Sequence, residues 1–272
     1  MGKRIYLLTL MFLLALPVCA VDAIGAEVEI ATGPGVIVSY SWKGAINDTI
    51  PVSVWLETYD NIIVGEIVYT NTKEKKPIQL FGTTHKGKSN IVEMLPDGLI
   101  TGSISGVITN TSFEGTWTSP DKVVEKGTRF ERASGKQYPI RLSAAIVPQA
   151  RPVFWGYDPA TFEGEYRYSY GKNNAIGTVS IRKADAGDVE YRIDTNIGAP
   201  SFNIAEIPLD NRTTEKGHPQ DNRIVYEYGP RCAVEILLFE GFLFTRYVEG
   251  KICQGEFGMN ASVAGVFMQQ KK

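Results

Sequence analysis

The sequence contains few of the residues from which catalytic and metal sites are usually built. Among its 272 residues there are only two histidines, and neither His85 nor His218 has a second histidine or a carboxylate at a metal-binding spacing. No phosphate-binding loop or dinucleotide fingerprint is present. Residues 102–106 have Ile104 at the position where a nucleophile elbow requires serine. We therefore expect no metal, no cofactor and no enzymatic activity.

An excess of basic residues is also absent. Lysine and arginine number 28 against 30 acidic residues, which gives a net charge of −2 and a pI of about 5.8. Proteins that bind nucleic acid duplexes usually carry a basic excess that neutralises phosphates, so we predict no nucleic acid partner. Apolar residues make up 43% of the chain, enough for a globular core in one large or two ordinary domains.

The first twenty residues have the organisation of a signal peptide. Lys3 and Arg4 precede the apolar run 5–16, and a small-residue pattern ends at Ala20. The run is shorter than the ~20 residues that a spanning helix needs. We expect residues 1–20 to be removed, with a cut after Ala26 as the second option, and the mature protein to be periplasmic or secreted.

Residues 16–19 also resemble a bacterial lipoprotein box, in which Cys19 would be acylated. The position before that cysteine is normally Gly, Ala or Ser, whereas this sequence has Val18. A lipid-anchored protein is therefore the alternative to a soluble one. We expect a membrane to be a partner only if Cys19 is acylated.

The mature chain then keeps two cysteines, Cys232 and Cys253. An even number in an oxidising compartment predicts a structural disulfide. A two-thiolate metal site would need histidine partners that are missing, and a redox pair would favour a C-x-x-C spacing. These two roles are the alternatives.

Helical periodicity is almost absent beyond the leader, whereas period-2 alternation of apolar and polar residues recurs along the chain. Strands of this kind with turns at near-even spacing predict an all-β protein made of two antiparallel β-meander domains, each barrel-like or sandwich-like. The expected strands are 52–57, 63–69, 78–82, 91–95, 99–104 and 113–117 in the first half, and 177–181, 189–193, 224–228, 232–236, 242–244 and 263–267 in the second.

Prolines separate the two β patterns. The first β domain is predicted to span 27–147 and the second 162–270, with a Pro-rich linker at 148–161, because proline cannot donate into a central ladder. The polar segment 208–223 is expected to be one long loop.

Glycines recur inside the expected strands in the pattern apolar-x-Gly-x-aromatic or apolar. A glycine in a strand interior usually marks a bend, a bulge or a close backbone approach, and we predict that role here. The residues that fit the pattern are Gly65, Gly102, Gly115, Gly164 and Gly265.

Two parts of the chain resemble modules of exported bacterial β-rich proteins of unassigned function. The first resemblance rests on 65–69, 78–82, Glu93, 101–102 and 115–117, which together resemble a β-meander module. The second rests on 232–236, 253–258 and 264–267, where the module pairs a strand cysteine with one before a glycine-rich turn. The resemblance implies an exported β-rich fold and no particular chemistry.

A shorter match involves residues 134–138, Ser-Gly-Lys-Gln-Tyr. This segment is similar to the S-G-x-x-Y loop of periplasmic lysozyme inhibitors. The resemblance implies that Ser134, Gly135 and Tyr138 form a binding loop, with Ser134 and Tyr138 contacting the catalytic residues of a lysozyme. The alternative is a turn at 133–136 that leads into a strand.

We therefore expect an exported, non-catalytic binding or inhibitor protein of the bacterial cell envelope. Its partner would be a secreted or periplasmic protein or a cell-wall component. A lysozyme inhibitor acting through 134–138 is one alternative. A hydrolase of wall polymers with an unrecognised carboxylate pair is another, and the acids available for such a pair include Glu66, Glu93, Glu114 and Glu165.

Overall fold

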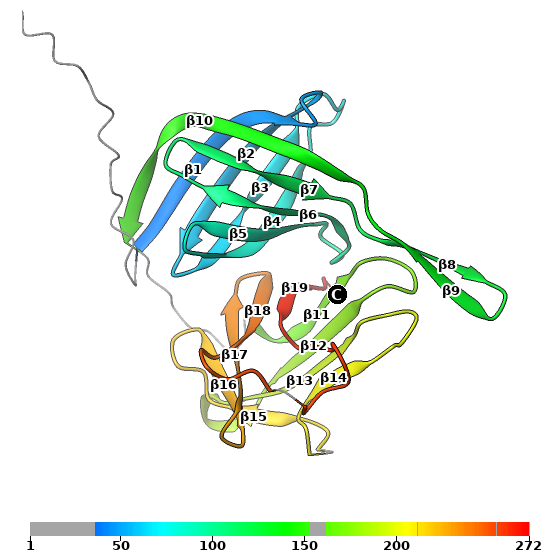
Figure 1. The fold of residues 1–272 in the computed structure, drawn as a ribbon. Coiled ribbons are helices and arrows are strands. Elements are labelled where there is room, and N and C mark those ends of the chain that lie inside the picture. Colours follow the sequence, from blue (N-terminus) through cyan, green and yellow to red (C-terminus); the bar gives the residue numbers. More distant parts are fainter. Residues whose placement is uncertain (1–35, 153–161, 211, 254, 272) are drawn as a thin grey trace, which may run out of the picture.

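The structure is a computed structural model that describes residues 36–152, 162–210, 212–253 and 255–271. Antiparallel strands account for nearly all of its regular secondary structure. They form a closed barrel, an open curled sheet and a separate two-stranded hairpin (Figure 1). The predicted all-β class is confirmed. The two expected cleavage sites, Cys19 and positions 153–161 of the expected linker lie outside the described residues.

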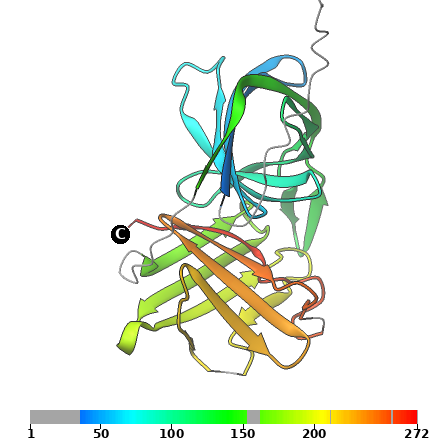
Figure 2. The same ribbon diagram turned by 90° about the vertical axis from the view of Figure 1, so that its left-hand side faces the viewer.

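The first β domain is an eight-stranded barrel in which neighbours in sequence are mostly neighbours in space (Figure 2). The order β1-β10-β7-β6-β5-β4-β3-β2 closes through the pairing of β1 with β2. Every pair is antiparallel, as a meander requires. The strands are β1 (Val36–Ile46), β2 (Ile50–Tyr59), β3 (Ile62–Tyr69), β4 (Pro77–His85), β5 (Lys88–Met94), β6 (Ile100–Ile108), β7 (Ser112–Thr118) and β10 (Gln137–Pro152).

Alternation fills the barrel interior, because every second side chain of each strand points inward. Trp42 on β1 stacks on Tyr40 with ring centroids 5.0 Å apart and lies 6.0 Å from Phe113. Such bulky rings fit because other inward positions are glycines. A Cβ added at Gly65 would lie 2.0 Å from the carbonyl oxygen of Trp55, which confirms the predicted close backbone approach there.

The last barrel strand, β10, differs from the sequence expectation. The linker was expected to begin at residue 148, but β10 runs on to Pro152, which pairs with Val36. A β-bulge explains how the strand tolerates Pro148, because the register shifts between the pairs Ser39–Gln149 and Ser41–Ile146 and a bulge interrupts the ladder. The strand that closes the barrel between β1 and β7 therefore contains prolines, and these prolines hide its alternating β pattern in the sequence.

The second β domain is an open sheet in the order β14-β13-β12-β11-β19-β18-β17-β16, with the short β15 also paired to β13. β15 lies inside the segment expected to be one long loop. Within the described part of the chain, no helix is long and apolar enough to span a membrane. The elements are β11 (Gly164–Ser169), β12 (Ile176–Lys183), the 3-10 turn η1 (Asp185–Gly187), β13 (Val189–Asn196), β14 (Ile204–Ile207), β15 (Glu215–Gly217), β16 (Arg223–Tyr228), β17 (Cys232–Phe239), β18 (Phe242–Tyr247) and β19 (Gly265–Gln269).

The barrel and the sheet share one hydrophobic core. Outward-facing side chains of the barrel, among them Phe81 and Met94, belong to the same buried cluster as Tyr168 and Phe244 of the sheet. Phe81 lies 4.7 Å from Phe242 between ring centroids. Since the barrel interior forms a second, separate cluster, the strands of this barrel wall are buried on both faces.

A hairpin inserted between β7 and β10 also joins the two domains. It consists of β8 (Lys122–Lys126) and β9 (Arg129–Ala133), which project from the barrel in Figure 1. Arg132 donates to the carbonyl oxygen of Ala199 at 2.5 Å, and Phe130 meets Phe202 edge to face at 5.4 Å. The hairpin therefore fastens the barrel to the sheet beside the shared core.

Candidate functional site

A cavity of about 350 Å³ lies between the outer wall of the barrel and the second sheet. Strand alternation creates it: Ile91 and Glu93 of β5 point into the barrel, so Asn90, Val92 and Met94 point towards the sheet. Its lining is mainly apolar, with a few polar groups. The apolar and aromatic residues are Phe81, Val92, Met94, Ile100, Tyr168, Tyr170, Phe244 and Val266, and the polar ones are Thr83, Asn90, Thr245 and Arg246.

The two tyrosines of this cavity come from β11 and the residues after it. Tyr168 and Tyr170 meet edge to face at 6.2 Å, and Tyr168 also contacts Phe267 at 4.9 Å. Burial raises the pKa of both phenols. Both therefore stay protonated at neutral pH and present an uncharged aromatic surface.

Arg246 on β18 forms the polar end of the cavity. Its Nε donates to Oε1 of Glu235, and its Nη1 donates to Oδ1 of Asn61 in the β2–β3 turn. Its Nη2 lies 3.4 Å from Oδ2 of Asp60. Arg223 donates to the other oxygen of Glu235 at 2.6 Å. The guanidinium of Arg246 thus links the sheet to the barrel around a carboxylate that is only 6% exposed.

A second cavity of about 710 Å³ adjoins the first and is more polar. Arg246 lines both cavities. The second one lies between the β2–β3 turn of the barrel and strands β16–β18 of the sheet. Its charged residues are Asp60, Asp221, Arg223, Glu235, Arg246 and Glu249, and its apolar and aromatic ones include Tyr59, Ile62, Leu237 and Phe239.

A buried carboxylate lies inside the barrel, away from both cavities. Oε1 of Glu93 accepts hydrogen bonds from the Tyr69 hydroxyl at 2.7 Å and from Trp117 Nε1 at 2.9 Å. Thr101 Oγ1 lies 3.4 Å from Oε2. Burial raises the pKa of Glu93, and these donors partly oppose that rise. We call Glu93, Tyr69, Thr101 and Trp117 the Glu93 cluster.

The structure separates the residues of the predicted binding loop. Ser134 is exposed in the turn between β9 and β10. The turn is held to the segment after β7, since Gly135 N donates to Asp121 Oδ1 at 3.0 Å. Tyr138 lies in β10, where its ring stacks on Trp117 at 6.1 Å. Tyr138 therefore borders the Glu93 cluster, whereas Ser134 lies outside it.

The other acids named for a carboxylate pair point to solvent. Glu66, Glu114 and Glu165 are all exposed, and only Glu93 is buried. His218 pairs with Asp188 at 2.8 Å on the surface. In the part of the chain that the structure describes, no three His, Cys, Asp or Glu side chains are grouped so that they could hold a metal ion.

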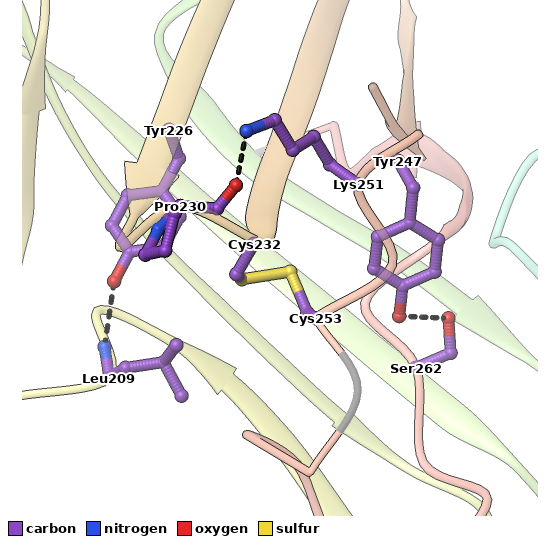
Figure 3. Close-up of a disulfide and its surroundings, with 8 residues drawn as sticks. All are labelled: Leu209, Tyr226, Pro230, Cys232, Tyr247, Lys251, Cys253 and Ser262. Carbon is purple, nitrogen blue, oxygen red and sulfur yellow. Dashed lines mark hydrogen bonds between the residues drawn. A yellow bond between two sulfur atoms is a disulfide. The ribbon is translucent and has the colours of Figure 1, made fainter. Parts of the chain in front are cut away.

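The predicted disulfide between Cys232 and Cys253 is confirmed (Figure 3). Both cysteines are buried, and the bond ties the start of β17 to the segment after β18. Tyr226 and Tyr247 flank the disulfide. The Tyr226 hydroxyl accepts a hydrogen bond from Leu209 N at 3.1 Å, and the Tyr247 hydroxyl is hydrogen bonded to the Ser262 hydroxyl at 3.0 Å. The bond thus fixes the start of β17, next to the edge strand β16, to the segment that follows β18.

Arg246 and Glu235 are site residues that the sequence patterns above do not single out. Residues 232–239 carry a sequence signal for Glu235, because seven apolar residues surround this one acid. Such a run predicts a strand covered on both faces. Glu235 is the one acid within the run, and a buried acid requires a partner.

No protein-family model and no curated protein matches the sequence. Among solved structures, the chain is similar to a protein of unknown function from the DUF3598 family of Nostoc punctiforme. The two share 14% identity over 82% of each chain, with a TM-score of 0.25. A TM-score of that size is too low to transfer any property to this chain. The resemblance of residues 134–138 to lysozyme inhibitors therefore rests on the sequence motif alone.

Proposed function

We propose that this protein is an exported, non-catalytic binding protein of the cell envelope that holds a small, mainly apolar ligand between its barrel and its sheet. The cavity of about 350 Å³ carries this proposal. Small-molecule sites are typically concave, mostly apolar and placed at domain interfaces, with a few polar groups that orient the ligand. Thr83, Asn90 and Arg246 supply those groups.

Export is supported by the buried disulfide between Cys232 and Cys253, because such bonds form and persist in oxidising compartments. The signal-like residues 1–20 agree with it. The lysozyme-inhibitor interpretation of Ser134 and Tyr138 stays a prediction. It would require a lysozyme to reach a turn that is hydrogen bonded to its own barrel.

Binding of N-phenyl-1-naphthylamine tests the proposal, because this neutral apolar probe fluoresces when it leaves water. We expect saturable binding to the mature protein. Val266→Trp should weaken it at least tenfold, because the larger side chain would occupy the cavity that Val266 lines. Val225→Trp is the matched control, since Val225 is 41% exposed on β16.

No saturable binding by the wild-type protein would refute the proposal. Equal affinity of the wild-type protein and the Val266→Trp variant would refute the placement of the ligand in this cavity. Circular dichroism of each variant confirms that the sheet is folded before binding is measured.

A further inference from the structure

The two cavities between barrel and sheet differ in polarity but share a wall. Arg246 lines both of them. Its aliphatic stem can lie along a ligand chain, whereas its guanidinium is held by Glu235 and Asn61. A ligand that fills the apolar cavity and extends past Arg246 would therefore enter the polar one.

The charges of the polar cavity are unbalanced. Four carboxylates line it, those of Asp60, Asp221, Glu235 and Glu249, against two guanidiniums, those of Arg223 and Arg246. Both guanidiniums are paired with Glu235. Within the described residues, the side chains of Asp221 and Glu249 take part in no ion pair. The balance of four negative and two positive groups leaves an excess of two negative charges, which favours a cationic group in this cavity.

The polar cavity can also hold a cation against aromatic rings. Tyr59 and Phe239 both line it, and the face of an aromatic ring attracts ammonium groups, although one face of the Phe239 ring is covered by Phe242. Phe239 stacks on Phe242 with centroids 4.8 Å apart, and Phe242 lies 4.7 Å from Phe81. Phe81 lines the apolar cavity. A continuous cluster of rings therefore runs from one cavity to the other.

We infer that the ligand is a cationic amphiphile, with a hydrocarbon or aromatic tail in the apolar cavity and an amine-bearing head in the polar one. This inference rests on the proposed function, since it requires the apolar cavity to be a ligand site. It adds the chemical class of the ligand and assigns Asp221 and Glu249 to head-group recognition. The fixed guanidinium of Arg246 separates the two parts of the site.

Three ligands with the same tail test the inference: decylamine and decanoate, each below its critical micelle concentration, and decanol below its solubility limit. Each competes with N-phenyl-1-naphthylamine at pH 7 and low salt, because surface charge effects are screened at high ionic strength. We expect decylamine to bind about tenfold more tightly than decanol, a difference of about 1.4 kcal/mol. We expect decanoate to bind most weakly.

A variant with Asp221→Asn and Glu249→Gln should bind decylamine no better than decanol and should keep its affinity for decanol. A variant with Glu227→Gln and Glu240→Gln is the matched control, because both acids are exposed and its net charge changes equally. Equal binding of decanol and decylamine by the wild-type protein, or tightest binding of decanoate, would overturn the inference and leave the proposed function standing. Failure of all three ligands to displace the bound probe would overturn the inference alone, because binding of the probe itself is the test of the proposed function.

Discussion

Replacing Tyr69 by phenylalanine tests the account of the Glu93 cluster. The substitution removes one hydroxyl and keeps the ring. The lost bond is a short one, 2.7 Å between Tyr69 Oη and Glu93 Oε1. A hydrogen bond to a charged group contributes about 1.5–3 kcal/mol, and a neutral one about 0.5–1.5 kcal/mol. We therefore expect the free energy of unfolding to fall by about 2 kcal/mol where Glu93 is ionised and by about 1 kcal/mol where it is protonated.

The pH dependence fixes the sign of this prediction. Burial raises the pKa of Glu93 in the folded protein above its ordinary value. The raised pKa contributes stability at pH values below the pKa of Glu93 in the unfolded chain. That stability is lost as the pH rises through the pKa of Glu93 in the folded protein. The Tyr69 bond lowers that pKa. Its loss raises the folded pKa further, so the cost of Tyr69→Phe must grow as the pH rises.

Urea unfolding followed by circular dichroism at pH 4 and at pH 7 measures the cost of the substitution at each pH. Tyr228→Phe is the control, because Tyr228 is 39% exposed and should cost nothing measurable at either pH. A cost of Tyr69→Phe that does not grow from the lower to the higher pH would refute the assignment of Tyr69 as a donor that favours the ionised form of Glu93.

Two further variants test the packing and the covalent link. Gly102→Ala would place a Cβ 2.6 Å from Trp117 Nε1 and 2.8 Å from Glu93 Oε2, so we expect a loss of about 1–3 kcal/mol in urea unfolding, with the exposed Ser105→Ala unchanged. Replacing both Cys232 and Cys253 by serine opens a bond with a sequence separation of 21 and should cost about 3 kcal/mol. An unchanged melting temperature in calorimetry would contradict that expectation.

Alternation was enough to predict the strands that have one polar and one apolar face. The expected strands 52–57 and 189–193 lie within β2 and β13, because water on one side of each strand leaves a period-2 pattern. The end of β10 falls within the predicted linker because its prolines resemble chain breakers. Only its position between β1 and β7 shows that Pro148 lies at a bulge.

The site depends on contacts between strands that are distant in sequence. The alternation of apolar and polar residues within one strand does not show which distant strands will be neighbours. The sequence identified Glu93 only as one acid among several, since its partners Tyr69 and Trp117 each lie 24 residues away. Arg246 meets Asn61 across 185 residues. The disulfide between Cys232 and Cys253 could be predicted from the sequence, because the expected mature chain has only these two cysteines and therefore one possible pair.

The core shared by the barrel and the sheet decides how the protein can be divided in the laboratory. A fragment restricted to residues 36–152 would keep the interior cluster of the barrel but would expose Ile62, Phe81, Met94 and Ile100, all of which are buried in the whole chain. Burial of each such side chain contributes about 1.5–3 kcal/mol. The isolated barrel would expose an apolar surface, and its copies would self-associate through that surface. The boundary between the two sheets is thus not a point at which the chain can be cut into independent soluble parts.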